Sequence, residues 1–444
     1  MIIQPARRIA GQLRLPGDKS ISHRAAIISA LADGRSRIEN FSTSEDCAAT
    51  LACLRRLGVS IERDGNTVTI EGVGLSGLRA PMEALDCGNS GSTMRMLAGA
   101  LAGHKFASTL TGDASLRTRP MRRIIAPLEQ MGARVQSEEG RAPLRISGRH
   151  PLTPIIYEMP VASAQLKSCV LLAGLNADGR TGVVENITTR DHTERMLRWF
   201  GVGVDRATAR RDDGETQTNI TLEGHTQPRA REVFIPGDIS SAAFFIVAAA
   251  LLPDSNLRLE NIGLNRTRAE LINTLQSLGV NVKTTEVREQ CNEEIGDIQV
   301  NGTRHGLAPA TTHGTAVNVL RGGLIAQLID ELPVLAVLGT QIEGGLEIRD
   351  AAELRIKETD RIGACVANLR RMGAEVWEHE DGLTIGDQVR LRGAKLEAYG
   401  DHRIAMAFTI AALIAEGESE ITGAECVGVS FPEFFALLET VIER

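Results

Sequence analysis

Cationic side chains stand at the beginning of several apolar segments of this sequence, where helices would begin. Lys19 and Arg24 lie at the start of an Ala-rich run, and Arg95 and Arg403 occupy similar positions in later segments. A cation in the first turn of a helix opposes the helix dipole and is mildly destabilising. The N–H groups at a helix N-terminus bind phosphate or carboxylate. The pattern therefore predicts that an anionic ligand completes these sites.

Three charged loop segments add further cations that could contact the same ligand. They are Arg117–Arg123, Thr189–Glu194 and Arg355–Arg361. Arginine binds carboxylate and phosphate through two parallel hydrogen bonds, whereas lysine acts as a movable point charge or proton donor. A solvated charged surface is the alternative interpretation of each segment. If the segments converge, they form a pocket that holds several anionic groups at once.

Two carboxylates lie among these cations and could transfer protons. Asp330 stands at a predicted helix start, and Glu358 directly follows Lys357. A carboxylate among cations stays ionised and can act as a base, while a lysine crowded by positive charge loses its proton more readily. His23 and His402 each adjoin a helix-start arginine and are further candidates. The motifs of zinc peptidases, P-loops and dinucleotide sites are absent from the sequence, so we predict no metal or cofactor.

The elements that must position these residues repeat six times along the chain. Each repeat has a small polar cluster, an apolar stretch and a glycine, beginning near Gly17, Gly88, Ala162, Gly237, Asp330 and Gly400. Apolar residues on all faces predict buried helices. A second pattern, an amphipathic helix followed by Gly and a strand, recurs around Gly58, Gly132, Gly201, Gly279 and Gly373. Glycine in the left-handed conformation commonly ends a helix in this way.

Alternating apolar residues predict short strands between these helices, for example at 67–71, 144–147, 298–300 and 383–385. Each repeat thus has about two helices and three or four strands, which indicates an α/β fold. Three repeats packed around their apolar helices would form one domain, and six would form two. Pro16-Gly17-Asp18 returns as Pro236-Gly237-Asp238, which favours duplicated halves. The alternative is that Ala-rich helices after glycine are simply common.

Composition narrows the class of protein. The 444 residues are 43% hydrophobic and 24% charged, with a formal net charge of −7, which argues against general nucleic-acid binding. The longest apolar run, 242–253, is far shorter than the roughly 20 residues that span a bilayer. No long apolar stretch follows the basic residues near the N-terminus, so we expect no secretory signal. Seven cysteines without a C-x-x-C pair are typical of a reducing compartment. We therefore expect a cytoplasmic enzyme or scaffold.

Six motifs in order resemble the 5-enolpyruvylshikimate-3-phosphate synthase family over essentially the whole chain. They are Leu15–Arg24, Gly88–Arg95, Arg117–Met121, Ala162–Gln165, Arg355–Arg361 and Gly400–Arg403. The resemblance implies two inside-out α/β barrel domains of three β/α units each, with buried parallel helices. One domain would comprise residues 1–17 and 235–444, and the other 18–234. The chain would cross between them near 17–18 and 231–236.

The resemblance also implies a reaction. The enolpyruvyl group of phosphoenolpyruvate would pass to the 5-hydroxyl of shikimate 3-phosphate, with release of phosphate, by addition and elimination through a tetrahedral intermediate. Asp330 would take the hydroxyl proton, and Glu358 and Lys19 would handle the methylene proton in a division that stays open, with His402 nearby. The shikimate 3-phosphate set would be Lys19, Ser20, Arg24, Ser163, Ala164, Gln165, Arg190, Asp330 and Lys357. The phosphoenolpyruvate set would be Lys19, Asn89, Gly91, Arg119, Gln165, Arg361 and Arg403.

Some features depart from parts of the family. A lysine that some members carry before a C-terminal Phe-Pro is absent near Val429, which puts one anion contact in doubt. Gly91 resembles a position that favours sensitivity to the inhibitor glyphosate, but the segments at 117–123 and 189–194 resemble an often tolerant branch. Glyphosate tolerance therefore stays open.

Two alternatives to this function remain. The sister enolpyruvyl transferase that acts on UDP-N-acetylglucosamine typically has a loop cysteine, which segment 112–119 lacks. A non-catalytic repeat scaffold would disperse its cations over the surface. For the enzyme we expect a monomer without nucleic-acid or membrane partners. We also expect shikimate 3-phosphate to draw the two cationic halves together.

Overall fold

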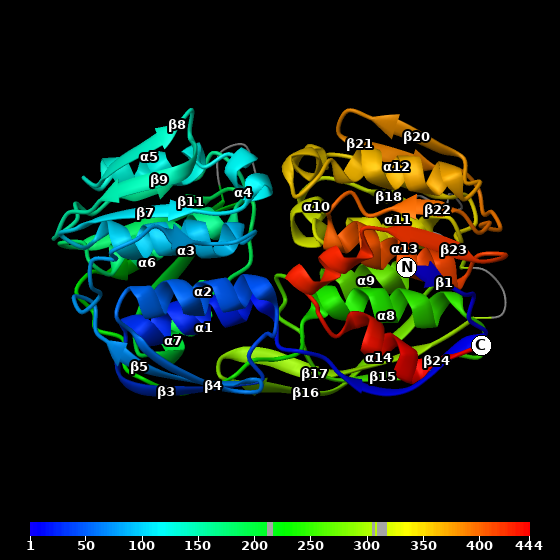
Figure 1. Cartoon of the computed structure of the whole chain (residues 1–444), viewed down its shortest axis with the longest axis horizontal. Coiled ribbons are helices and arrows are strands. Elements are labelled where there is room, and N and C mark those ends of the chain that lie inside the picture. Colours follow the sequence, from blue (N-terminus) through cyan, green and yellow to red (C-terminus); the bar gives the residue numbers. More distant parts are fainter. Residues whose placement is uncertain (211–215, 304–306, 309–317) are drawn as a thin grey trace. The chain divides into compact units, whose positions relative to one another are not determined.

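The computed structural model describes residues 1–210, 216–303, 307–308 and 318–444. They form two compact units, whose chain is coloured by sequence in Figure 1. The terminal unit comprises Met1–Leu15, Pro236–Glu289 and Glu294–Arg444. The inserted unit comprises Pro16–Ile235 and Gln290–Glu293. The short segment 290–293 is thus separated along the sequence from the rest of its unit.

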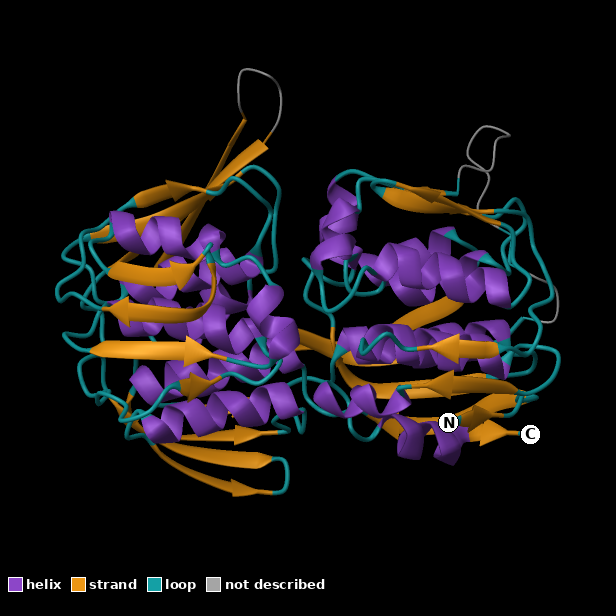
Figure 2. Ribbon diagram, turned by 45° about the horizontal axis from the view of Figure 1, so that its top comes forward, coloured by secondary structure: helices purple, strands orange, loops and turns teal. Residues whose placement is uncertain are grey.

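Three apolar helices form the interior of the inserted unit. They are α1 (Lys19–Leu31), α3 (Gly91–Ala102) and α6 (Ala164–Gly174). Their residues are buried almost throughout, as helices that are apolar on all faces must be. Figure 2 shows the helices of this unit (purple) inside a layer of strands (orange). The first turns carry the polar residues that the sequence pattern singled out.

Three four-stranded sheets of the inserted unit repeat one pattern. Their strand orders are β14-β3-β5-β4, β6-β7-β9-β8 and β10-β11-β13-β12. In each sheet the first pair is parallel and the next two pairs are antiparallel. The strands are β3 (Asp33–Glu39), β4 (Ser60–Asp64), β5 (Thr67–Val73), β6 (Leu85–Asp86), β7 (Ala107–Thr111), β8 (Arg134–Glu138), β9 (Arg141–Ser147), β10 (Ile156–Glu158), β11 (Arg180–Glu185), β12 (Val204–Arg210), β13 (Thr216–Glu223) and β14 (Glu232–Phe234).

The terminal unit also combines three apolar helices with three sheets, but its sheets have five, four and three strands. Its apolar helices are α8 (Ile239–Leu251), α11 (Leu332–Gly339) and α13 (His402–Leu413). Its sheets have the orders β16-β17-β15-β2-β24, β18-β19-β21-β20 and β1-β23-β22. The strands are β1 (Ile2–Ile3), β2 (Arg8–Arg14), β15 (Asn256–Gly263), β16 (Asn281–Gln290), β17 (Glu293–Asn301), β18 (Val319–Leu320), β19 (Leu346–Ile348), β20 (Val376–His379), β21 (Gly382–Ile385), β22 (Lys395–Glu397), β23 (Ser419–Thr422) and β24 (Ile442–Glu443). The fold is the α/β class that the repeats predicted, and the four strand segments named from the sequence all lie in strands.

Five amphipathic helices end at the glycines that the second pattern marked. They are α2 (Glu45–Arg56), α5 (Arg122–Gln130), α7 (His192–Trp199), α9 (Glu270–Ser277) and α12 (Arg361–Arg371). The glycines that follow them have φ between 84° and 93°, a left-handed conformation that costs other residues free energy. This confirms the predicted order of helix, glycine and strand. Shorter connecting helices are α4 (Ala114–Thr118), α10 (Gly323–Leu328), α14 (Phe434–Val441) and the 3₁₀ turns η1 (Ala352–Ile356) and η2 (Ala424–Val429).

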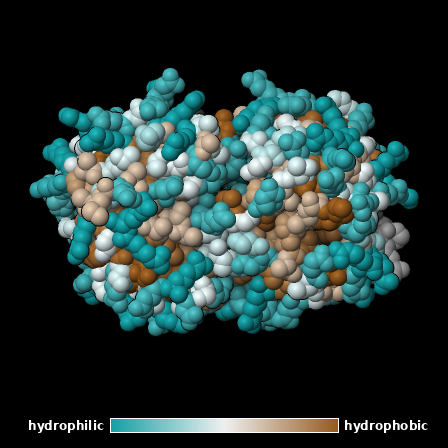
Figure 3. All heavy atoms as spheres, in the orientation of Figure 1, coloured by the Kyte–Doolittle hydropathy of each residue, from teal (hydrophilic) through white to brown (hydrophobic). Residues whose placement is uncertain are grey.

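The seven cysteines carry no disulfide, and five of them are buried. Cys169 lies inside α6, where burial raises the pKa of its thiol, so it behaves as a packing residue. Within the described ranges, no helix has the length and hydropathy that crossing a membrane requires. The face drawn in Figure 3 is largely hydrophilic (teal), with apolar side chains (brown) in separate patches.

Candidate active site

The predicted site residues divide between the two units and gather at helix starts. The inserted half-site comprises Lys19, Ser20, Arg24, Asn89, Gly91, Arg119, Ser163, Ala164, Gln165 and Arg190. The terminal half-site comprises Asp330, Lys357, Glu358, Arg361, His402 and Arg403. Helices α1, α3 and α6 begin in the first group, and α11, α12 and α13 begin in the second. Each half-site therefore combines helix N-termini with cationic side chains.

Side-chain caps hold the three helix starts of the inserted half-site. Asp18 Oδ1 accepts a hydrogen bond from the Ile21 N–H at 2.9 Å. Ser90 and Ser163 cap α3 and α6 in the same way, at 3.1 and 3.3 Å. Each cap stabilises its helix by about 1 kcal/mol. Capping by Asp and Ser, which the sequence predicted as their ordinary role, is confirmed at these positions.

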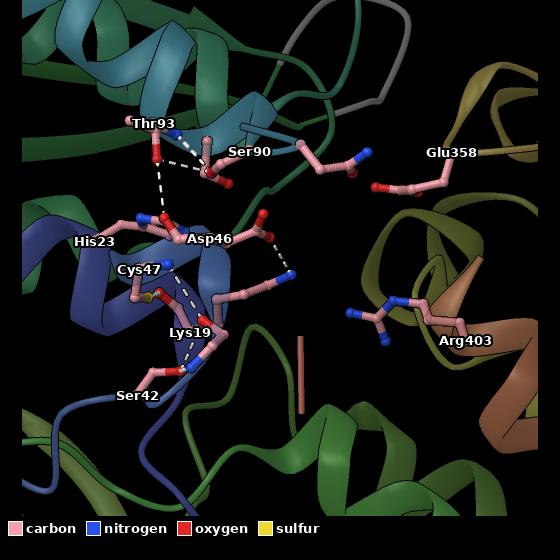
Figure 4. Close-up of polar contacts among 12 residues, drawn as sticks. Lys19, His23, Ser42, Asp46, Cys47, Ser90, Thr93, Glu358 and Arg403 are labelled. Carbon is pink, nitrogen blue, oxygen red and sulfur yellow. Dashed lines mark hydrogen bonds and ion pairs between the residues drawn. The ribbon is translucent and has the colours of Figure 1, made fainter. Parts of the chain in front are cut away.

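Lys19, the first residue of α1, forms an ion pair within the inserted half-site. Its Nζ lies 2.7 Å from Asp46 Oδ2, and both side chains are largely buried. Figure 4 shows the ammonium group directed at this carboxylate. Asp46 was not predicted from the sequence, because an acidic residue in the first turn of a helix is ordinary helix chemistry. The contact holds the Lys19 ammonium group at the N-terminus of α1.

Gln165 links α6 to α3. Arg95 Nη1 donates to Gln165 Oε1 at 2.5 Å, and Gln165 Nε2 donates to Ser92 Oγ at 2.8 Å. Gly91 lies beside this linkage: a Cβ added there would be 2.8 Å from Arg95 Nη1 and 3.6 Å from Arg119 Nη1. A side chain at position 91 would therefore displace the Arg95 guanidinium.

Arg119 lies in the loop between α4 and α5 and contacts the start of α3. Its Nη2 donates to Asn89 Oδ1 at 2.6 Å and to Ser115 Oγ at 3.2 Å. Asn89 Nδ2 in turn donates to Asp113 Oδ2 at 2.8 Å. The guanidinium is thus anchored next to Gly91, although it comes from a segment that the sequence alone could have placed on a solvated surface.

Arg24 is buried in the second turn of α1. Burial lowers the pKa of its guanidinium to about 10, and the nearby carboxylates of Glu194 and Asp18 oppose this shift. The side chain remains a cation at neutral pH. Arg190, half-buried in the loop before α7, adds a second positive charge that also lowers the Arg24 pKa. Two cations held close together favour a ligand with two or more negative charges.

Arg361 organises the terminal half-site. Its side chain is 1% exposed and contacts three carboxylates: Asp401 at 2.7 Å, Glu358 at 2.6 Å and Asp330 at 3.6 Å. Their combined charge outweighs burial and raises the Arg361 pKa above its ordinary value. A single guanidinium therefore holds both predicted proton-transfer carboxylates. The role of Asp401 was not predicted, because it stands in the sequence as a helix cap.

Arg403 contacts one of these carboxylates from the first turn of α13. Its Nε lies 3.6 Å from Asp330 Oδ1, and its Nη1 donates to the Asp330 backbone carbonyl at 2.9 Å. The Arg403 N–H donates to Asp401 Oδ1 at 2.8 Å. Asp330 therefore lies near two guanidinium groups, those of Arg361 and Arg403.

Lys357 directly precedes Glu358 in the loop between η1 and α12. Removal from water is the main cause that lowers the pKa of its ammonium group, although the side chain is only half-buried. The Arg361 charge lowers this pKa further, while Asp330, Glu353 and Glu358 oppose the shift. From the sequence we expected a lysine crowded by positive charge to lose its proton more readily; the direction of the pKa shift agrees, but burial is the larger cause here.

The two candidate histidines occupy different environments. His23 is buried in α1, where its Nδ1 lies 2.7 Å from Thr50 Oγ1 of α2. Burial holds the pKa of His23 well below its usual value, with Lys19 and Arg24 adding to the shift, so the ring is neutral at pH 7. His402 is the first residue of α13, is 3% exposed, and lies next to Arg403.

Two buried ionic clusters adjoin the half-sites and were not predicted. One joins Lys167 of α6 to Glu185 and Glu194, all nearly inaccessible to water. The other places Arg268 3.6 Å from Glu331, the residue that precedes α11. Lys167 offered a signal, because a lysine inside an apolar helix needs a buried counter-charge. Among the described residues, no group of His, Cys, Asp and Glu is arranged to hold a metal ion.

Comparison with known proteins identifies the group to which these features belong. Residues 3–438 match the family model described as EPSP synthase (3-phosphoshikimate 1-carboxyvinyltransferase). A 3-phosphoshikimate 1-carboxyvinyltransferase of Koribacter versatilis is 51% identical over 443 residues, covering 100% of this chain and 99% of the relative. The enzyme of that name from Solibacter usitatus is 49% identical, covering 99% of both chains.

Solved structures show the same likeness. EPSP synthase from Acinetobacter baumannii is similar with a TM-score of 0.84 and 40% sequence identity, covering 99% of this chain and 97% of that one. The enolpyruvyl transferase NikO from Streptomyces tendae has a TM-score of 0.77 at 20% identity, which shows a shared fold. Both likenesses agree with the inside-out α/β architecture.

Proposed function

The chain belongs to the EPSP synthase family, the 3-phosphoshikimate 1-carboxyvinyltransferases, and from this premise we propose that its two half-sites serve one reaction. The enzyme is a transferase that moves the enolpyruvyl group of phosphoenolpyruvate to shikimate 3-phosphate in the shikimate pathway. The observation that carries our assignment of roles is the Arg361 cluster, in which one buried guanidinium holds two carboxylates suited to proton transfer.

The addition step joins the 5-hydroxyl oxygen of shikimate 3-phosphate to C2 of phosphoenolpyruvate. Asp330 takes the hydroxyl proton, and C3 of phosphoenolpyruvate gains a proton to become a methyl group. Asp330 lies 3.6 Å from both Arg361 and Arg403, whose charges orient its carboxylate for this role as a base. The elimination step breaks the bond from C2 to the phosphate oxygen, releases phosphate, and removes one proton from the methyl group.

Glu358 and Lys19 handle the proton at the methyl carbon. Glu358 Oε2 lies 2.6 Å from Arg361 Nη2, which fixes the direction of the carboxylate. Lys19 is held by Asp46 at 2.7 Å and supplies a positive charge to the phosphate groups of the substrates. Positioning of reacting groups and stabilisation of charge then account for catalysis without a cofactor.

The cations divide between the two substrates. Arg24 and Arg190 bind the anionic groups of shikimate 3-phosphate together with Ser20, Ser163, Ala164, Gln165 and Lys357. Arg119 and Arg403 bind phosphoenolpyruvate together with Asn89, Gly91, Gln165 and Arg361, and His402 lies beside them. The support for this division is that Arg119 is anchored at the start of α3, whereas Arg24 is buried in α1.

We further propose that the protein acts as a monomer in the cytoplasm and needs no nucleic-acid or membrane partner. The buried, unbridged cysteines support a reducing compartment. The net charge of −7 supports the absence of a general nucleic-acid site.

A phosphate-release assay tests the function. Purified protein is mixed with shikimate 3-phosphate and phosphoenolpyruvate in the presence of a chelator, and products are identified by mass spectrometry. We expect phosphate release only when both substrates are present, with a product that carries the added enolpyruvyl group. Release from phosphoenolpyruvate alone, or no release at all, would contradict the proposal.

A further inference from the structure

The first turn of α7 makes three different buried contacts through three consecutive residues. His192 Nδ1 lies 2.7 Å from Glu293 Oε1, and Glu194 Oε1 lies 2.8 Å from Lys167 Nζ. Between them, Thr193 Oγ1 accepts a hydrogen bond from Arg24 Nε at 2.7 Å. All of these side chains are nearly inaccessible to water. This turn follows directly after Arg190 and Asp191.

The contact with Thr193 belongs to a shell that orients Arg24. Arg24 Nη1 donates to the Ser20 carbonyl at 2.7 Å, and Nη2 donates to Ser168 Oγ at 2.8 Å. The Ser168 and Thr193 hydroxyls are themselves 2.7 Å apart. A guanidinium has five N–H donors, so these three bonds leave one N–H on each Nη atom for a ligand. The shell thus fixes the plane of the guanidinium and leaves donors for a carboxylate or phosphate.

Glu293 reaches this turn from a distant part of the chain. It stands at the tip of the hairpin formed by β16 and β17, and residues 290–293 belong to the inserted unit. Asn292, in the same tip, accepts a hydrogen bond from Arg195 at its carbonyl (2.9 Å) and donates one from its side chain to the Arg195 carbonyl (3.3 Å). The hairpin tip therefore contacts α7 at two residues, His192 and Arg195. One of them, the pair of Glu293 and His192, is buried.

The preceding loop is fixed from the other side. Thr189 Oγ1 donates to Glu185 Oε2 at 2.8 Å, and Lys167 Nζ donates to the Thr189 carbonyl at 3.4 Å. Arg190 therefore lies between a loop anchored by Lys167 and a helix turn anchored by Glu293. Of the cations assigned to shikimate 3-phosphate, the two arginines, Arg24 and Arg190, depend on the position of this turn.

We propose that Glu293 is a positioning residue for shikimate 3-phosphate: through His192 it holds the first turn of α7, and thereby Thr193, Arg24 and Arg190. The inference rests on the proposed function of the two arginines and adds a residue that touches neither substrate. Arg119 is anchored by Asn89 and Ser115, and Arg403 by Asp330, so we expect Glu293 to affect binding of shikimate 3-phosphate more than that of phosphoenolpyruvate.

The test compares Glu293→Ala with Glu289→Ala, which removes an exposed carboxylate from the same hairpin. Affinity for shikimate 3-phosphate alone is measured by calorimetry, and KM for phosphoenolpyruvate is measured at saturating shikimate 3-phosphate. We expect Glu293→Ala to weaken shikimate 3-phosphate binding about tenfold, the effect of losing one charge-assisted hydrogen bond. KM for phosphoenolpyruvate stays within about twofold of wild type, since Arg119 and Arg403 are anchored by other residues. Glu289→Ala changes neither value.

Two milder variants decide the matter if Glu293→Ala does not fold. Glu293→Gln keeps a hydrogen-bonding side chain and should recover most of the affinity, while Thr193→Val removes only the hydroxyl that orients Arg24 and should reproduce the selective loss. Normal shikimate 3-phosphate affinity in folded Glu293→Ala or Thr193→Val would overturn the proposal, as would an equal loss for both substrates. Failure of the proposed function would give a different result from failure of the Glu293 proposal. In that case the wild-type protein would neither bind shikimate 3-phosphate nor release phosphate.

Discussion

Removal of Arg361 should destabilise the terminal unit strongly, because three carboxylates would lose their common partner. Asp401 is inaccessible to water, and Asp330 and Glu358 are less than one-fifth exposed. Breaking a buried ion pair by removing one partner costs about 3–5 kcal/mol, since the other charge stays buried. Arg361→Ala should therefore lower the free energy of unfolding by about that amount.

A surface pair provides the matched control. Arg390 lies 3.3 Å from Glu416, with its side chain 90% exposed, so Arg390→Ala should cost less than about 1 kcal/mol. Both variants are compared with wild type by urea unfolding followed by circular dichroism, with m-values used to check that the same surface unfolds. An Arg361→Ala free energy within about 1 kcal/mol of wild type would refute the reasoning that the carboxylates depend on this guanidinium.

Three further perturbations have definite outcomes. Burial lowers the pKa of His23, so its contribution to stability is complete above pH 6.5 and is lost as pH falls towards the folded pKa. His23→Asn should therefore reduce the loss of unfolding free energy in acid by up to about 1.4 kcal/mol per pH unit below 6.5. Arg119→Ala should raise KM for phosphoenolpyruvate about tenfold or more with the circular dichroism spectrum unchanged, because a guanidinium contact to an anion is lost. Gly91→Ala should displace Arg95 from Gln165 and weaken substrate binding, whereas unchanged affinities would show that the guanidinium moves without consequence.

The sequence predicted the helices and strands well because each is marked by a pattern of neighbouring residues. Apolar residues on every face of 242–250 leave burial as the only stable environment for α8, and a glycine after each amphipathic helix marks its end. The sequence did not predict which strands β14 and β2 pair with. Each pairs in parallel with a strand distant in sequence, β3 or β15, and periodicity carries no information about pairing partners.

The site was predicted by residue type better than by contact. Cations at helix starts pointed to Lys19, Arg24 and Arg403, but their partners came from elsewhere in the chain. Asp46 and Asp401 stand in first turns or caps, where a carboxylate has an ordinary explanation. The family relationship, more than spacing, decides between the two enolpyruvyl transferases and excludes the non-catalytic scaffold.

Transfer of solvent deuterium into the product tests the central claim most directly. If Glu358 or Lys19 delivers a solvent-exchangeable proton to C3 during addition, reaction in D2O passes through a methyl group that contains deuterium. Elimination then leaves deuterium in the methylene group of the product, which proton NMR detects as a loss of signal. The account predicts this incorporation in wild type and much slower turnover for Glu358→Gln. Full product formation in D2O with no deuterium in the methylene group would contradict it.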